Sequence, residues 1–271
     1  MISLFDYIFW GSVLVLIGVW IIAKNYIQLS IPLWKIIIGI IFVYIGLRIM
    51  FKAGPGCCPV RESGNMITET RTLSSFDSVE FRGYGNLFIT RGEEHSVAIA
   101  ADEAVIQRIR TDVGNGKLVI NTDFYIKRTA VDIHLTVPTL KSIRSMGAGT
   151  IKSDQTIASP SLEAVLGGVG KITLAVDVDS LSTRISGAGK IELSGTARDH
   201  SISLSGAGKL DAFDLLSEGV RVQSTGAGKC EVHASKTLDV TISGVGKVEY
   251  KGDPAVTQSI TGFGSLKRKN N

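Results

Sequence analysis

Apolar and polar residues alternate along most of the second half of the chain. In the segment from Ile202 to Ala212, which reads ISLSGAGKLDA, an apolar residue or a glycine occupies every second position. A period of two is typical of a strand with one buried face. The glycines either point inward, where a missing side chain lets the backbone approach its neighbour, or adopt a positive φ and mark a corner. Either way, each such segment predicts about two short strands and a turn.

This pattern recurs around a Gly-x-Gly motif at steps of 18 to 21 residues. The structural repeat glycines are Gly147, Gly149, Gly168, Gly170, Gly187, Gly189, Gly206, Gly208, Gly226, Gly228, Gly244, Gly246, Gly262 and Gly264. A fixed period indicates a stack of equivalent units. A unit of about 19 residues is too short for a βαβ crossover, which needs about 30. The sequence therefore predicts an all-β fold, a single-stranded parallel β-helix or solenoid whose rungs stack about 4.8 Å apart.

Stacked rungs bring equivalent residues into columns. The inward column is predicted to contain Ile151, Ile172, Ile191, Leu210, Cys230, Val248 and Leu266. An outward surface ladder is predicted from Lys171, Lys190, Lys209, Lys229 and Lys247. A carboxylate follows two residues after four of these lysines and offsets the repulsion between them. This pattern favours a solvated, striped face over an anion-binding strip, and it makes Cys230 a core residue rather than a reactive thiol.

Residues 139–266 carry the repeats, and residues 68–138 are predicted to form an atypical N-terminal capping part of the same domain. There the segment 81–89 looks like a degenerate first rung. The strand-like runs 86–90 and 96–100 are separated by RGEEH, which predicts a hairpin. A short helix is expected over 102–110 with Asp102 as its cap. Residues 267–271 form a basic tail that discourages strand addition at the far end.

Two apolar segments precede this domain. Residues 7–23 contain no charge, and residues 31–51 carry charges only near their ends. Aromatic residues lie near the ends of both segments, as interface anchors do. We predict a transmembrane helical hairpin over 1–52 with spans at about 7–23 and 31–51, followed by a linker over 53–67. A signal peptide is the alternative, and an acidic start and the lack of a cleavage site disfavour it. Positive charges near the spans leave the side of the membrane undetermined, and acylation of Cys57 and Cys58 stays open.

No catalytic, cofactor-binding or metal site emerges from the remaining residues. The net charge of +4 comes without a basic patch interleaved with aromatic residues, so nucleic acid is not an expected partner. The Gly-x-Gly-Lys motif lacks the glycine spacing and the Ser or Thr of a phosphate loop. The four histidines are dispersed without metal-ligand spacing. The sequence therefore predicts no enzyme and no cofactor.

Three motifs in order resemble a known family. FDSV at 76–79 with LFITRG at 87–92, then VPTLKSI at 137–143, and then the repeated SGAGK, resemble the auto-transporter adhesin head GIN domain, one of the bacterial β-solenoid "toastrack" domains. The apolar stretch 11–47 is similar to the transmembrane region of LiaI- and LiaF-like envelope-stress proteins. The resemblance implies a β-solenoid in the bacterial cell envelope, and it supplies no catalytic residues.

Three functions are compatible with these features. The first is a membrane-tethered, non-enzymatic module that contacts the lipid bilayer through its hairpin and binds a protein or glycan partner in envelope sensing or adhesion. The second is a carbohydrate-active β-helix enzyme, which requires paired acids that do not stand out here. The third is a structural spacer that forms a homo-oligomer through its open C-terminal end.

Overall fold

The computed structural model describes residues 65–122 and 131–269. The chain divides into two compact units, Met1–Cys58 and Pro59–Asn271. The predicted transmembrane hairpin lies outside the described residues, as do Cys57 and Cys58. In the part that is described, no helix is long and apolar enough to cross a membrane.

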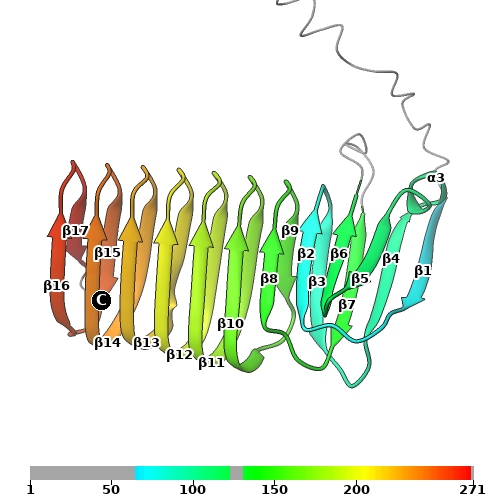
Figure 1. Cartoon of the computed structure of the whole chain (residues 1–271), viewed down its shortest axis with the longest axis horizontal. Coiled ribbons are helices and arrows are strands. Elements are labelled where there is room, and N and C mark those ends of the chain that lie inside the picture. The colour runs from blue at the N-terminus through cyan, green and yellow to red at the C-terminus, as the bar shows by residue number, and fades with distance from the viewer. Residues whose placement is uncertain (1–64, 123–130, 270–271) are drawn as a thin grey trace, which may run out of the picture. The chain divides into compact units, whose positions relative to one another are not determined.

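Within the described ranges, 17 strands join into one continuous sheet that winds into a β-solenoid (Figure 1). The first strands are β1 (Met66–Thr72), β2 (Ser78–Arg82), β3 (Asn86–Arg91), β4 (Ser96–Asp102), β5 (Arg110–Gly114), β6 (Lys117–Asn121), β7 (Asp132–Val137), β8 (Ser142–Ser145) and β9 (Thr150–Ser153). The later strands are β10 (Ile157–Leu166), β11 (Lys171–Ile185), β12 (Lys190–Leu204), β13 (Lys209–Ser224), β14 (Lys229–Ile242), β15 (Lys247–Lys251), β16 (Ala255–Ile260) and β17 (Ser265–Arg268). A short helix, α3 (Glu103–Ile106), lies between β4 and β5. The predicted all-β solenoid is confirmed.

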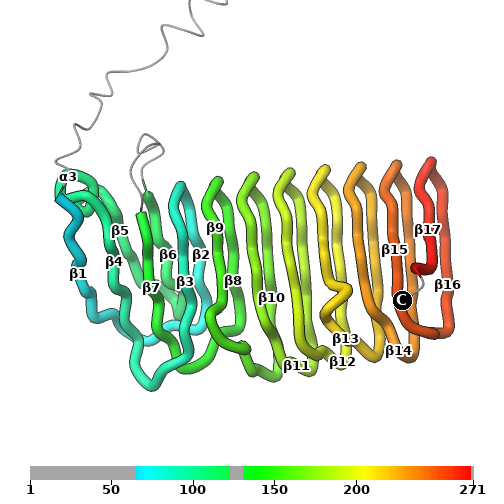
Figure 2. Tube along the Cα trace, turned by 180° about the vertical axis from the view of Figure 1, so that it is seen from behind, coloured from blue at the N-terminus to red at the C-terminus, as the bar shows by residue number. Residues whose placement is uncertain are grey.

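Each coil of the solenoid has two faces and two edges. The Gly-x-Gly turns stack along one edge, here called the turn edge, which is uppermost in Figure 1. The chain then descends the first face, rounds the opposite bend edge, and ascends the second face to the next turn. The long strands β11 to β14 each run through both faces, and neighbouring strands are parallel and in register. A register shift between Ala212 and Leu216 bulges β13 outward, and this bulge interrupts the smooth coil in Figure 2.

The core is a set of columns between the two faces. Inward residues are apolar because every second residue of each strand points into the space between the two faces, where it is withdrawn from water. The predicted inward column is confirmed by the register of the strands and reads Ile151, Ile172, Ile191, Leu210, Cys230, Val248 and Leu266. Cys230 is free and fully buried in this column, and burial raises the pKa of its thiol to about 12.

The order of the coils near the N-terminus differs from the order of the sequence. Strand β2 pairs with β6 and β8, and β3 pairs with β7 and β9. The coil made by β2 and β3 therefore lies inside the stack. The predicted hairpin between 86–90 and 96–100 is wrong, because β7 lies between β3 and β4 and pairs with both. With β7 inserted, β3 has a parallel strand partner on each side, β7 and β9. A turn motif in the sequence does not reveal this pairing, because β7 lies far from β3 along the chain.

The N-terminal end of the stack is closed by antiparallel strands. Strand β4 pairs with β7 and β1, and β5 pairs with β6. Asp102 caps α3, as predicted, by accepting a hydrogen bond of 2.9 Å from the Ala104 amide. The helix ends at Ile106, earlier than predicted, because Arg110 already begins β5. At the C-terminal end, β16 pairs only with β14 and β17 only with β15 in the described chain, which leaves this end open.

Candidate functional site

The turn edge shows why its glycines are needed. None of the structural repeat glycines has a positive φ, so they are not corners of the left-handed type. A Cβ added at Gly187 would lie 2.8 Å from the carbonyl carbon of Gly168 and 2.9 Å from the carbonyl oxygen of Gly167 in the coil below. These separations are shorter than van der Waals contact. Of the two alternatives that the sequence left open, close approach of stacked backbones is therefore the one that holds.

The first face carries a ladder of ion pairs, here called the charge ladder. Its lysines are Lys171, Lys190, Lys209, Lys229 and Lys247, which lie in register on successive coils. Its acids are Glu192, Asp211, Glu231 and Glu249. Each acid bridges the lysine of its own coil and the lysine of the coil before it. Glu192, for example, lies 2.6 Å from Lys190 and 2.7 Å from Lys171. Each of these lysines therefore has at least one carboxylate partner on the same face.

Burial and pairing act in opposite directions on the acids of the charge ladder. Burial raises the pKa of Glu192, but hydrogen bonds from Lys171, Lys190 and Thr173 more than offset this effect and lower the pKa to about 2. Hydrogen bonds from Lys229 and Lys247 likewise lower the pKa of Glu249 to about 2. Glu192 and Glu249 thus stay ionised throughout the physiological range of pH, which maintains their ion pairs with the lysines.

The second face has a different character, because its outward side chains are mainly hydroxyl, amide and charged groups. One column contains Ser182, Ser201, Arg221, Asp239 and Thr257, and its neighbour contains Arg184, Ser203, Gln223, Thr241 and Ser259. A shallow groove crosses this face beside Gly219. A Cβ at Gly219 would meet only side-chain ends, Asp199 Oδ1 at 3.1 Å and Thr237 Oγ1 at 3.2 Å. The missing side chain thus opens a polar notch in an otherwise flat face.

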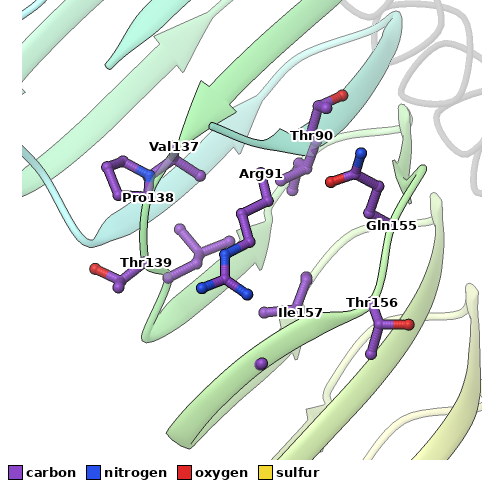
Figure 3. A pocket seen from close by; sticks show the side chains of 11 residues that line it. Thr90, Arg91, Val137, Pro138, Thr139, Gln155, Thr156 and Ile157 are labelled. Atoms are coloured by element: carbon purple, nitrogen blue, oxygen red, sulfur yellow. The ribbon is translucent and has the colours of Figure 1, made fainter. Parts of the chain in front are cut away.

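A small cavity lies where β3, β7 and β10 reach the bend edge. Figure 3 shows Arg91, Pro138 and Ile157 around it, and its volume is about 20 Å³. A space of this size holds one water molecule. It therefore does not serve as a binding pocket for a substrate or cofactor.

Thr183 and His200 form a polar pair among the buried residues of the described chain. Thr183 Oγ1 lies 2.9 Å from His200 Nε2, and both residues are buried. Burial lowers the pKa of His200 to about 3, so the ring stays neutral in the folded protein. Among the residues that the structure describes, no cluster of three His, Cys, Asp or Glu side chains could hold a metal ion. The two side chains therefore form a buried polar contact within the core.

The comparisons with known proteins agree with this architecture. Residues 75–254 match the family described as "Putative auto-transporter adhesin, head GIN domain". No curated protein matches the chain.

Solved structures with the same fold come from species of Bacteroides and Parabacteroides. A "putative adhesin" from Bacteroides fragilis is 24% identical, with a TM-score of 0.73 over 79% of this chain and 100% of that one. A "putative lipid binding protein" from Parabacteroides distasonis is 24% identical, with a TM-score of 0.65 over 77% of this chain and 98% of that one. A "putative adhesin" from Parabacteroides merdae is 22% identical, with a TM-score of 0.59 over 77% and 98%. These likenesses show the fold. With the family match over 75–254, they place the chain in the family of the auto-transporter adhesin head GIN domain.

Proposed function

We propose that this protein is a membrane-tethered, non-enzymatic binding module of the bacterial cell envelope, which presents the second face of its solenoid to a protein or glycan partner. The observation that carries the proposal is the contrast between the two faces. The acids of the charge ladder are each held between two lysines on the first face, whereas the second face exposes columns of mixed hydroxyl, amide and charged groups.

The geometry of the second face suits an extended ligand. Equivalent positions on successive coils lie about 4.8 Å apart, so a linear polymer laid along the stack meets a continuous row of polar side chains. The notch beside Gly219 adds a place where a group of the ligand can enter between Asp199 and Thr237. Asp239 and Arg221, whose side chains lie 3.5 Å apart, supply an acceptor and donors at its margin. The names of the related structures, two adhesins and a lipid-binding protein, support a binding role.

Filling the notch tests the proposal directly. The full chain in lipid nanodiscs is screened against an array of bacterial glycans and against immobilised envelope proteins. The Gly219→Gln variant, whose side chain fills the space above Asp199 and Thr237, is expected to lose at least about tenfold in affinity for whatever the wild type retains. Glu218→Gln is the matched control, since it changes an exposed neighbour that pairs only with Lys236. Equal retention of ligands by both variants, or no retention by the wild type, contradicts the proposal.

The side of the membrane decides between adhesion and intracellular sensing. Protease added to intact cells is expected to digest the β-domain if it serves in adhesion. Protection in cells with digestion in inverted vesicles would instead assign the second face to a cytoplasmic partner.

The open C-terminal end favours a second candidate, a spacer that forms homo-oligomers. Val256 and Ile260 are exposed on β16, and the outer edges of β16 and β17 have no strand partner within the described chain. Such an edge is a template for pairing with another chain. A particle mass in detergent that falls from oligomer to monomer in a Val256→Lys variant supports this candidate, and a monomeric wild type removes it.

A further inference from the structure

Exposed apolar side chains gather on the turn edge. The large ones there are Met66 (55% exposed), Tyr84 (41%), Met146 (41%), Val169 (66%), Val245 (57%) and Phe263 (94%). In the described chain, the other exposed large apolar side chains are Leu216, Val256 and Ile260, and the last two belong to the open end. One edge therefore concentrates apolar surface that a solvated edge does not need.

The middle residue of each Gly-x-Gly turn forms the apex of this edge. In spatial order the apices are Tyr84, Ala148, Val169, Ala188, Ala207, Ala227, Val245 and Phe263. Backbone bonds stack them in a row, since the amide of Ala148 donates to Gly83 O at 2.8 Å and the amide of Val169 donates to Gly147 O at 3.1 Å. Turn apices in water usually carry Asn, Asp, Ser or Gly. In the Gly-x-Gly turns that the structure describes, every apex is Ala, Val, Tyr or Phe, and the flanking glycines leave each one pointing outward.

A row of positive charge runs beside the apices. The lysines of the charge ladder follow the apices by two residues and lie on the first face next to the edge, with a shallow groove between Ala188, Lys190 and their equivalents. Their carboxylate partners lie two residues further along the strand, which is about 6.6 Å further from the turn edge than the lysines. The ladder has five lysines against four carboxylates, and its positive row is the one nearer the edge. Apolar groups flanked by lysines are the chemistry of a surface that binds anionic lipid headgroups.

The described chain begins at the same edge. Met66 pairs with Asp102 at the end of β4, and Ala100 of that strand lies opposite Asp132 of β7. Asp132 lies opposite Asn86, the residue that follows the turn at Gly85. Figure 1 shows β1 starting at the turn edge accordingly. The chain therefore enters the β-domain from the turn edge.

We propose that the turn edge rests on the surface of an anionic phospholipid bilayer. The apices lie at headgroup level, the lysine row reaches the lipid phosphates, and the axis of the stack runs parallel to the membrane plane. The proposal deepens the proposed function and rests on its membrane tether. It leaves both faces upright above the bilayer, so that the second face is open to a partner along its whole length.

Site-specific photo-cross-linking of the full chain tests this orientation. p-Benzoylphenylalanine replaces Phe263 or Val169 on the turn edge, Asp179 on the bend edge, or Ile38 in the predicted second span. Each variant is placed as one copy in a nanodisc containing phosphatidylglycerol and phosphatidylcholine, and lipid adducts are counted by mass spectrometry. We expect adducts at 38, 169 and 263, with at least about fivefold more at the two edge positions than at 179. Discs of phosphatidylcholine alone are expected to reduce the edge adducts roughly fivefold while leaving those at 38 unchanged.

Each other outcome overturns a defined part of the proposal. Adducts at 38 with equal, low yields at 263 and 179 overturn the edge contact and leave the tether standing. Adducts at 263 and 169 without any at 38 overturn the tether alone. In vesicles that hold several copies, cross-links between chains at 169 without lipid adducts would show that a second copy covers the edge instead. Edge adducts that persist unchanged in phosphatidylcholine overturn the role of anionic lipid.

Discussion

Replacement of Gly187 by alanine probes the close stacking of the turns. The residue lies in the middle of the stack, and its φ is one that alanine adopts without strain. The cost of the substitution therefore comes only from the space that the new Cβ needs. That Cβ would lie 2.8 Å from the carbonyl carbon of Gly168, where a comfortable carbon–carbon contact is about 3.5–4.0 Å. The turn must move away from the coil below by roughly 1 Å.

A movement of this size breaks the bonds that join the two turns. The Ala188 amide donates to Gly168 O at 3.2 Å, and the Gly187 amide donates to Leu166 O at 3.3 Å. Both bonds are already near the long end of the normal range. Losing each costs about 1 kcal/mol, and displacement of the next coil adds strain of similar size. We expect Gly187→Ala to lower the free energy of unfolding by about 2–4 kcal/mol, a large fraction of the total for a domain of this kind.

Urea titration followed by circular dichroism in the β-sheet region measures this loss on the full chain in detergent. Two variants serve as controls. Ala188→Ser changes the exposed apex next to Gly187, and Gly219→Ala adds a Cβ that meets only mobile side-chain ends. Both controls are expected to stay within about 0.5 kcal/mol of the wild type. A Gly187→Ala midpoint equal to that of Ala188→Ser would refute the argument that backbone contact makes glycine necessary in these turns.

Three further predictions concern buried groups. Glu231→Gln is expected to cost about 1–3 kcal/mol in urea unfolding, because the nearly buried carboxylate holds Lys209 and Lys229 together, whereas Glu218→Gln in an exposed pair is expected to cost less than 0.5. The pKa of His200 is lowered to about 3 when folded, so the unfolded chain takes up a proton first as pH falls below 6.5, and stability is lost on acidification. Between pH 7 and 5, above the range in which the carboxylates titrate, the free energy of unfolding of the wild type is expected to fall by about 2 kcal/mol. A Thr183→Val/His200→Leu variant, which removes both partners, is expected to show no such fall. An equal fall in both proteins would exclude His200 as the cause. Cys230, whose thiol pKa is raised to about 12, is expected to resist iodoacetamide until urea unfolds the chain, as read by mass spectrometry of its peptide.

The repeats could be predicted because their information is local. The period places Ile172 and Ile191 in one column without knowledge of any distant segment, and the alternation tells which side chains point inward. The charge ladder follows from the same reasoning, since the carboxylate of Glu192 lies two residues from Lys190 on the same face. One register rule thus predicts the core and the first face together.

The N-terminal part could not be predicted in the same way, because its pairing is long-range. Strand β3 lies beside β7, and Asn86 hydrogen-bonds Asp132 at 2.8 Å across 46 residues of sequence. A turn signal such as RGEEH at 91–95 reports only that the chain reverses, and not which strand lies next to it. The inward His200 was missed for a related reason. A histidine at an inward position looks like a solvent-exposed residue in the sequence. Its burial is tolerated because Thr183 on the neighbouring coil forms a hydrogen bond with it.

The columns also show where such a solenoid tolerates change. A side chain at Gly187 or Gly206 would meet the backbone of the coil before it, so it would disturb the spacing of the coils. An outward residue such as Ser201 or Gln223 contributes one position to a face and none to the spacing of the coils. Substitutions on the second face therefore alter the chemistry offered to a partner while leaving the stack intact. By the same logic the apices form a third independent surface, because Val245 or Phe263 can change without moving the glycines beside them. In this repeat, the inward residues and the turn glycines hold the coils together, whereas the outward residues and the apices form the surfaces offered to a partner or a membrane. Substitutions in one outward column can therefore change one binding surface without disturbing the stack.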